Sequence, residues 1–149
     1  MFVIVNISDS DKHFSTAIEE YVKRLGKNVH FETLKPFKDT NRELVIQKET
    51  EQILKVIEKK YQHFKKFLLI KEGKKLTTEE LHQEISHKDC LFIIGGPFGI
   101  DEKMMRKGFP EMEELSFGAI TMPHGLAKLV LIEQLYRCST LDSGKSYHY

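Results

Sequence analysis

An unbroken apolar run that stops at a cluster of glycines constrains this chain more than any other stretch. Leu91–Ile94 has no polar alternation, and Gly95, Gly96 and Gly99 follow it around Pro97. Such a run is typical of a strand buried on both faces, as in a parallel sheet covered by helices. Ligands of these sheets bind beyond the carboxyl ends of the strands, where glycine lets the backbone approach them closely. The pattern predicts a small-molecule site, although a strand-to-helix turn that binds nothing also needs glycine.

The glycine loop is a poor cradle for phosphate. Its spacing fits neither the GxGxxG fingerprint nor the P-loop, and no Lys-Ser or Lys-Thr pair follows it. We therefore do not expect a dinucleotide or a nucleoside triphosphate. Thr121–Gly125 is a second turn with proline and glycine after a predicted strand, and the two turns together could form one pocket.

Apolar runs alternate with amphipathic segments along the whole chain. We expect strands at 2–7, 29–34, 67–70, 91–94 and 115–120, and helices at 12–25, 40–61, 77–85, 101–107 and 126–139. Thr40 with Glu43, and Thr77 with Glu80, have the spacing of capping boxes, and 71–75 is expected to be a turn. This series predicts an α/β fold, a three-layer sandwich with a mostly parallel sheet.

The last predicted helix is apolar almost all round. Such a helix must be buried, either in the core of its own chain or against another subunit. For a chain of 149 residues, a dimer is the economical solution.

Composition predicts one globular domain that spans residues 1–149, because 40% of the residues are hydrophobic. No apolar stretch reaches the roughly 18 residues of a membrane span, and the start lacks the basic region of a signal peptide, so we expect a cytoplasmic protein that contacts no membrane. Cys90 and Cys138 are expected to be small core residues. The lysine-rich segment 55–75 is either a phosphate-binding surface or, more commonly, a solvated helix face.

Four sequence blocks, in this order, carry a resemblance to a known family. They are Ile94–Gly99, Ile120–His124, Leu131–Arg137 and Tyr147-His148. Over essentially its full length the chain resembles RlmH, the SPOUT-superfamily methyltransferases that act on N3 of a pseudouridine in bacterial 23S ribosomal RNA. The resemblance implies a C-terminal trefoil knot, a homodimer, ribosomal RNA or the ribosome as partner, and S-adenosylmethionine as cofactor without a metal.

The resemblance also implies that backbone groups of three loops hold the cofactor. By matching motif positions, the cofactor-binding residues are Leu69, Ile70, Gly95, Gly96, Gly118, Ala119, Ile120, Thr121, Met122 and Pro123. The family commonly has Ser at position 118, Arg at 128 and Arg or Lys at 149. This chain has Gly118, Lys128 and Tyr149 instead, and the loss of a terminal cation affects contact with RNA phosphate or an anion.

Methylation at N3 requires that the proton on this nitrogen leaves, so a base or groups that stabilise the developing anion should lie opposite the methyl group. The candidates are His124, Arg137, Tyr147 and His148. Each has a simpler alternative: His124 caps the last helix, Arg137 pairs with Glu133 at i,i+4, and the two tail residues are only a chain end. A non-catalytic RNA-binding relative, or a flavodoxin-like ligand-binding regulator, remains an alternative function.

Overall fold

Five parallel strands form one sheet in the computed structural model, which describes residues 1–9, 12–145 and 147. The strands are β1 (Phe2–Ile7), β2 (Val29–Leu34), β3 (Lys65–Lys75), β4 (Cys90–Ile94) and β5 (Glu113–Ser116). Their order across the sheet is β2-β1-β4-β3-β5, and every pairing in it is parallel. The glycine loop therefore follows the central strand, β4.

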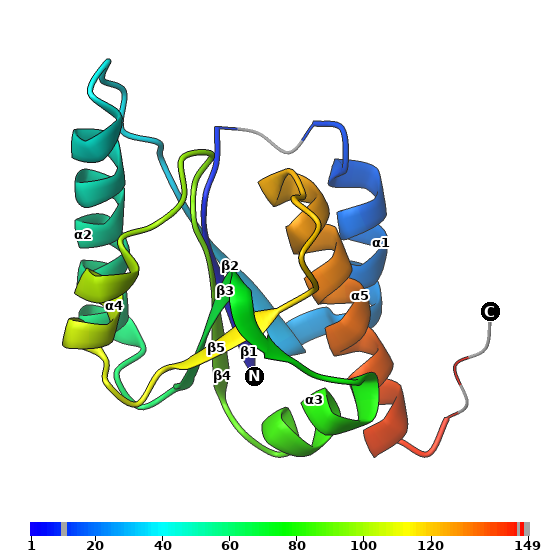
Figure 1. Ribbon diagram of the computed structural model, residues 1–149. Coiled ribbons are helices and arrows are strands. Elements are labelled where there is room, and N and C mark those ends of the chain that lie inside the picture. The colour runs from blue at the N-terminus through cyan, green and yellow to red at the C-terminus, as the bar shows by residue number, and fades with distance from the viewer. Residues whose placement is uncertain (10–11, 146, 148–149) are drawn as a thin grey trace.

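Helices cover both faces of this sheet, so the predicted three-layer α/β sandwich is confirmed (Figure 1). They are α1 (Ser15–Leu25) with the short 3-10 turn η1 (Gly26–Asn28), α2 (Arg42–Lys60), α3 (Thr78–Ile85), α4 (Glu102–Gly108) and α5 (His124–Asp142). Figure 1 shows α2 and α4 on one face and α1, α3 and α5 on the other. The trefoil knot stays a prediction, because strand order and pairing do not report how the chain is threaded.

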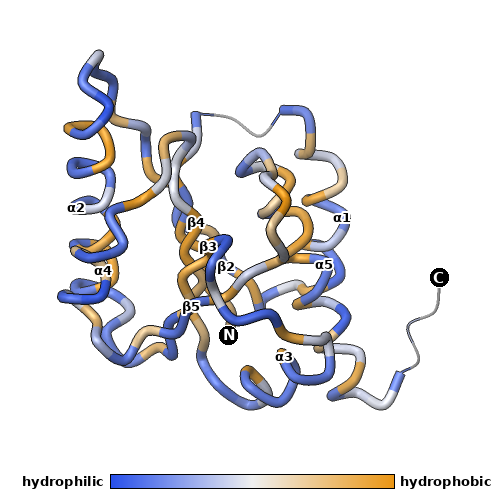
Figure 2. Tube along the Cα trace, viewed as in Figure 1, coloured by the Kyte–Doolittle hydropathy of each residue, from blue (hydrophilic) through white to orange (hydrophobic). Residues whose placement is uncertain are grey.

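The core lies on both sides of β4, whose residues are all buried. Alternate side chains of this strand point to opposite faces: Phe92 packs in the cluster under α1, α3 and α5, while Leu91 and Ile93 pack in the cluster under α2 and α4. Figure 2 shows the same arrangement as hydrophobic strands between the helices. Burial raises the pKa of the Cys90 thiol to about 11 and that of Cys138 to about 12, so both are confirmed as core residues.

One of the two predicted capping boxes is present. At the start of α3, the Thr77 side chain accepts a hydrogen bond from the backbone N–H of Glu80, and the Glu80 carboxylate accepts one from the backbone N–H of Thr77. The box predicted from Thr40 is wrong. Helix α2 begins one residue later, and Asn41 caps it by accepting a hydrogen bond from Leu44 N at 3.2 Å. Asn serves as well as Thr at this position.

Strand β3 is longer than predicted and β5 is shorter. The segment 71–75, expected as a turn, continues β3 past a register shift between Leu69 and Lys74. Gly73 makes this possible, because a Cβ there would come within 2.6 Å of the Leu115 carbonyl carbon. Since β5 ends at Ser116, residues 117–120 become loop. The lysine-rich segment is not one solvated helix face, because Lys66 lies in β3 and is only 2% exposed.

Two helices of the second face, α1 and α5, also differ in length from the prediction. Helix α1 begins at Ser15 rather than near 12, and no side chain caps it. Helix α5 extends through Asp142 and buries Leu131, Ile132 and Leu135 against the sheet. None of the helices in the described part of the chain is long and apolar enough to cross a membrane.

Candidate active site

A cavity of about 880 Å³ lies beyond the carboxyl ends of β4 and β5, beside residues 69–72 in the middle of β3. It is lined by both predicted glycine- and proline-containing turns, so these turns do form one pocket. Nine of the ten residues predicted to bind the cofactor line it, and Ala119 is the exception; the nine are Leu69, Ile70, Gly95, Gly96, Gly118, Ile120, Thr121, Met122 and Pro123. Their role in binding a cofactor stays a prediction.

The chemistry of the lining suits a ligand without phosphate. Among the described residues that line the cavity, Lys71 is the one lysine or arginine, and two glutamates, Glu72 and Glu102, also face it. A phosphate site would be expected to gather cations, whereas this lining has more carboxylates than lysines or arginines. Two apolar side chains at the cavity are exposed to solvent, Phe98 at 43% and Ile120 at 79%. These side chains are available to contact a ligand or a partner.

Backbone turns shape the two loops of the cavity. In the glycine loop, Gly99 N donates a hydrogen bond to the Gly96 carbonyl at 2.9 Å, and Gly99 has φ +89°. In the second loop, the Ser116 hydroxyl donates to the Lys71 carbonyl at 2.8 Å and accepts from Gly118 N at 3.0 Å. Ser116 therefore ties the end of β5 to β3. No local sequence pattern marks Ser116, because its partner is remote in sequence.

A buried carboxylate supports the glycine loop from behind. Glu49, on α2, is 2% exposed, and its Oε2 accepts a hydrogen bond from Phe37 N at 3.0 Å. A Cβ on Gly96 would lie 2.6 Å from Glu49 Oε1, an oxygen with no hydrogen-bond partner among the described residues. Burial raises the pKa of Glu49, while the Phe37 hydrogen bond and the charge of His124 act in the opposite direction. Position 96 therefore has to be glycine for a reason that is independent of any ligand.

The next residue of α2 supports the other end of the same loop. Thr50 Oγ1 accepts a hydrogen bond from Asp101 N at 3.0 Å, and Asp101 in turn caps α4 by accepting from Met104 N at 2.9 Å. The sequence contains a signal for both α2 residues: Glu49 and Thr50 interrupt the apolar face between Val45 and Ile53 of an amphipathic helix. Polar residues on a core-facing stripe indicate a specific partner.

The predicted catalytic residues fall into two groups. His124 is the first residue of α5 and lines the cavity. Arg137 lies roughly 20 Å further along the helix axis, forms the predicted ion pair with Glu133, and stacks its Cζ 4.6 Å from the centroid of the Tyr147 ring. Neither Arg137 nor Tyr147 lines the cavity. His148 lies outside the described residues, as does Tyr149.

Two of the three departures from the family pattern lie in the described part of the chain. Gly118 has φ +111°, a conformation that favours glycine. Lys128 is 6% exposed, and its ammonium lies 4.6 Å from the centroid of the Phe31 ring. This cation therefore lies within the fold, between α5 and β2.

Comparison with known proteins decides the family. The model of the family described as "Predicted SPOUT methyltransferase" matches residues 1–148. The chain belongs to the SPOUT methyltransferase family. Two curated relatives of this SPOUT protein are both named Ribosomal RNA large subunit methyltransferase H. The one from Mycoplasmopsis pulmonis is 32% identical over 97% of both chains, and the one from Streptococcus suis is 36% identical over 93% of this chain and 92% of its own.

A solved structure agrees with the SPOUT fold. The Ribosomal RNA small subunit methyltransferase E from Neisseria gonorrhoeae, bound to S-adenosyl methionine, aligns with a TM-score of 0.57. The alignment covers 91% of this chain and 65% of that one, at 14% sequence identity. At this identity the likeness concerns the fold alone.

Proposed function

We propose that this SPOUT protein transfers a methyl group from S-adenosylmethionine to N3 of a pseudouridine in bacterial 23S ribosomal RNA, in the cytoplasm and as a homodimer. Two relatives that align over more than nine-tenths of this chain bear the name of a large-subunit ribosomal RNA methyltransferase. The observation that carries the proposal is the cavity at the ends of β4 and β5, beside the middle of β3. Residues 1–149 act in this proposal as one domain.

The cavity suits the proposed cofactor in size and in chemistry. Its volume of about 880 Å³ falls within the range of small-molecule sites. Glycine backbone at two loops leaves room for hydrogen bonds from main-chain groups to a nucleoside. Met122, Ile94 and Leu115 supply apolar walls for its uncharged parts. When bound there, S-adenosylmethionine supplies a methyl group already activated by a sulfonium.

The residues of the chain then have three tasks, which are to align the N3 atom of the base, exclude water and accept the N3 proton. The new bond joins N3 to the methyl carbon, the methyl–sulfur bond breaks with its electron pair left on sulfur, and the N3 proton passes to a base or to solvent. His124 lines the cavity, and a histidine ring nitrogen is a common general base in enzymes. Arg137, Tyr147 and His148 are proposed to contact the base and stabilise its developing anion.

The separation of these residues supports a homodimer. His124 and Arg137 lie near opposite ends of α5, roughly 20 Å apart along its axis, so one chain does not bring them to one substrate. A two-fold symmetric pair places equivalent surfaces against each other in opposite directions. In that arrangement, the tail of one subunit reaches the cavity of the other. The exposed Phe98 and Ile120 at the cavity suit a surface that a partner covers.

The decisive experiment measures transfer of labelled methyl groups from S-adenosylmethionine to ribosomes that lack this modification. We expect close to one methyl group per ribosome, located at N3 of a pseudouridine when the RNA is digested and analysed by mass spectrometry. Separate incubations with free 23S RNA, the large subunit and the assembled ribosome identify the substrate. Cofactor binding without any transfer would contradict the proposal and favour the non-catalytic RNA-binding relative.

A further inference from the structure

A cluster of rings and guanidinium groups joins α1 to the C-terminal half of α5. The rings of Tyr21 and Tyr136 lie 5.9 Å apart between centroids. The Arg24 guanidinium carbon lies 5.5 Å from the Tyr21 centroid and 5.4 Å from the Tyr136 centroid, so it covers both rings. We call Tyr21, Arg24 and Tyr136 the tyrosine dock.

The tail residue Tyr147 occupies this dock. Its hydroxyl lies 3.4 Å from the Tyr21 hydroxyl, within hydrogen-bond distance, and its ring meets the Tyr136 ring edge-on with centroids 5.1 Å apart. The Arg137 guanidinium covers the Tyr147 ring at 4.6 Å. The hydrogen bond with Tyr21 is also the first cause of a raised pKa at Tyr147. Side chains from two helices therefore hold the tail at this point.

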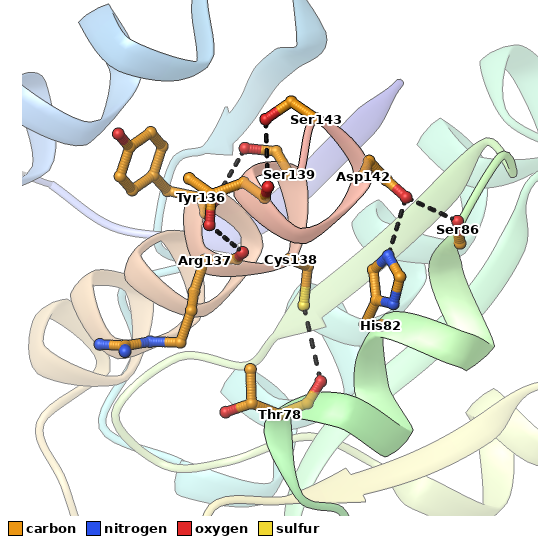
Figure 3. A network of polar contacts seen from close by, with 10 residues as sticks. Thr78, His82, Ser86, Tyr136, Arg137, Cys138, Ser139, Asp142 and Ser143 are labelled. Carbon is orange, nitrogen blue, oxygen red and sulfur yellow. Dashed lines mark hydrogen bonds and ion pairs between the residues drawn. The ribbon is translucent and has the colours of Figure 1, made fainter. Parts of the chain in front are cut away.

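The dock itself is built on fixed elements. Helix α3 holds the end of α5, because His82 Nε2 and Ser86 Oγ contact Asp142 Oδ1 at 2.7 Å and 2.8 Å, and Figure 3 shows Tyr136 and Arg137 extending away from these contacts. On α1, Glu20 pairs with Arg24 at 2.9 Å and orients its guanidinium. The dock thus provides a fixed surface, and its contacts offset the entropy that the tail loses when it becomes ordered.

We propose that Tyr21 and Arg24 are positioning residues for methyl transfer, which act by holding Tyr147 where the catalytic tail begins. This inference rests on the proposed function. Neither residue lines the cavity, so their effect on the reaction has to pass through the tail rather than through the cofactor. The Tyr21 hydroxyl fixes the position of the Tyr147 phenol, and Arg24 holds the rings against which Tyr147 packs. Tyr147 itself is then held at a defined point beside α5.

A double-mutant cycle tests this role. Tyr21→Phe and Tyr147→Phe each remove one hydroxyl of the pair and keep both rings. We expect each variant to lower the single-turnover methyl-transfer rate about threefold to tenfold, the range expected for one lost hydrogen bond. The double variant should be no slower than the slower single variant, because both changes break the same contact. Affinity for S-adenosylmethionine, measured by calorimetry, should stay unchanged in all three.

The stacking contact of the dock has its own matched pair of variants. Arg24→Gln removes the guanidinium over the two rings, while Lys23→Gln removes an equal charge from the exposed neighbouring position of α1. We expect Arg24→Gln to slow transfer about threefold to tenfold, consistent with a cation–π contact, and Lys23→Gln to leave the rate unchanged. Equal losses in both variants would mean that only the net charge of α1 matters, which would overturn the role of Arg24.

A second measurement, made on the protein alone, separates this inference from the proposed function. The NMR signals of the Tyr147 ring should shift in Tyr21→Phe and stay in place in Lys23→Gln. Rate losses that multiply in the double variant would overturn the role of the dock. Ring signals of Tyr147 that do not shift in Tyr21→Phe would overturn it as well. A shifted ring in a protein whose wild type transfers no methyl group would instead refute the proposed function, and with it the kinetic role of Tyr21.

Discussion

The two ends of α5 are built in different ways. At the N-terminal end, the cavity beside His124 is shaped mainly by backbone turns, with glycines at positions 95, 96, 99 and 118. At the C-terminal end, the surroundings of Tyr147 are made of side chains, namely Tyr21, Tyr136 and Arg137. One helix thus connects a site made by the main chain to a site made by rings and cations.

The difference indicates how the work is divided in the proposed reaction. A cavity made by the backbone tolerates changes in its side chains as long as its glycines stay. It suits a cofactor that is the same molecule in every reaction. A cluster made of side chains can be altered one group at a time, and it suits the recognition of one base. Variants at the two ends should therefore separate cofactor affinity from methyl transfer.

Deletion of residues 147–149 should produce the largest difference between methyl transfer and cofactor affinity. It removes the tail from the dock and leaves the cavity intact, so methyl transfer should fall by about 10²-fold or more, as for a lost acid–base group. Affinity for S-adenosylmethionine should change by less than about threefold. Single-turnover kinetics and calorimetry measure the two quantities. A truncated protein with near-normal turnover would move the catalytic role to His124 and Arg137.

Mixing variants shows whether the cavity and the tail that form one reaction site come from different subunits. The tail deletion is combined with Gly96→Val, at an S-adenosylmethionine concentration low enough that each variant alone is strongly impaired, under conditions that exchange subunits. If the tail of one subunit serves the cavity of the other, random pairing restores about a quarter of the wild-type activity, because half of the dimers have one intact site of two. No recovery in a mixture with demonstrated exchange would contradict a shared site.

Gly96→Val should have the next largest effect, at the cavity end. The added Cβ would lie 2.6 Å from Glu49 Oε1 and 3.3 Å from Ile7 Cγ2, so either the glycine loop or the buried Glu49 side chain has to move. We expect cofactor affinity to fall by at least about tenfold and the free energy of unfolding to fall by about 1–3 kcal/mol. Calorimetry and thermal denaturation measure these losses.

Two controls separate the collision with Glu49 from a general loss of stability. Gly26→Ala is also strained, because Gly26 has φ +60°, but it has no atom near its Cβ and lies far from the loop in sequence. It should lower stability and leave cofactor affinity unchanged. Glu49→Ala, combined with Gly96→Val, makes room for the valine and should restore part of the lost stability. Unchanged affinity in Gly96→Val would remove the glycine loop from the cofactor site.

Asp142→Asn should have the smallest effect, and it depends on pH. Burial acts to raise the pKa of Asp142, but hydrogen bonds from His82 and Ser86 outweigh it, so the pKa lies below its usual value. Because the folded-state pKa is the lower one, the carboxylate stabilises the fold above the unfolded-state pKa, and this contribution is lost as the pH falls through the folded-state value. With 35% of the side chain exposed, we expect Asp142→Asn to lower the free energy of unfolding at pH 7 by only about 0.5–1 kcal/mol.

Denaturation at several pH values checks this expectation. The difference between wild type and Asp142→Asn should shrink toward zero at acid pH, where both side chains are neutral. Asp89→Asn provides the matched control, since the Asp89 carboxylate pairs with the terminal ammonium of Met1 and is more exposed. A difference that is independent of pH would assign the effect of Asp142 to packing rather than to charge.

The sequence predicted the fold well because its strongest signals are local. Leu91–Ile94 has no polar residue and is followed by glycines, which is typical of a strand covered on both faces, and the alternating amphipathic segments supply the covering helices. It also predicted the cavity, because glycine and proline at 95–99 and 121–125 mark the strand ends where parallel sheets hold ligands. Element ends were less certain, as for β5, since tertiary pairing decides where a strand stops.

By itself, the amino-acid sequence determined the layers, the buried central strand and the turns that line the cavity, because burial periodicity and backbone freedom are properties of neighbouring residues. Only the tertiary structure decided which distant groups meet. Glu49 behind Gly96, and Tyr21 against Tyr147, join segments that no local pattern connects. It also placed Tyr147 far along α5 from His124, since a straight helix holds its two ends apart.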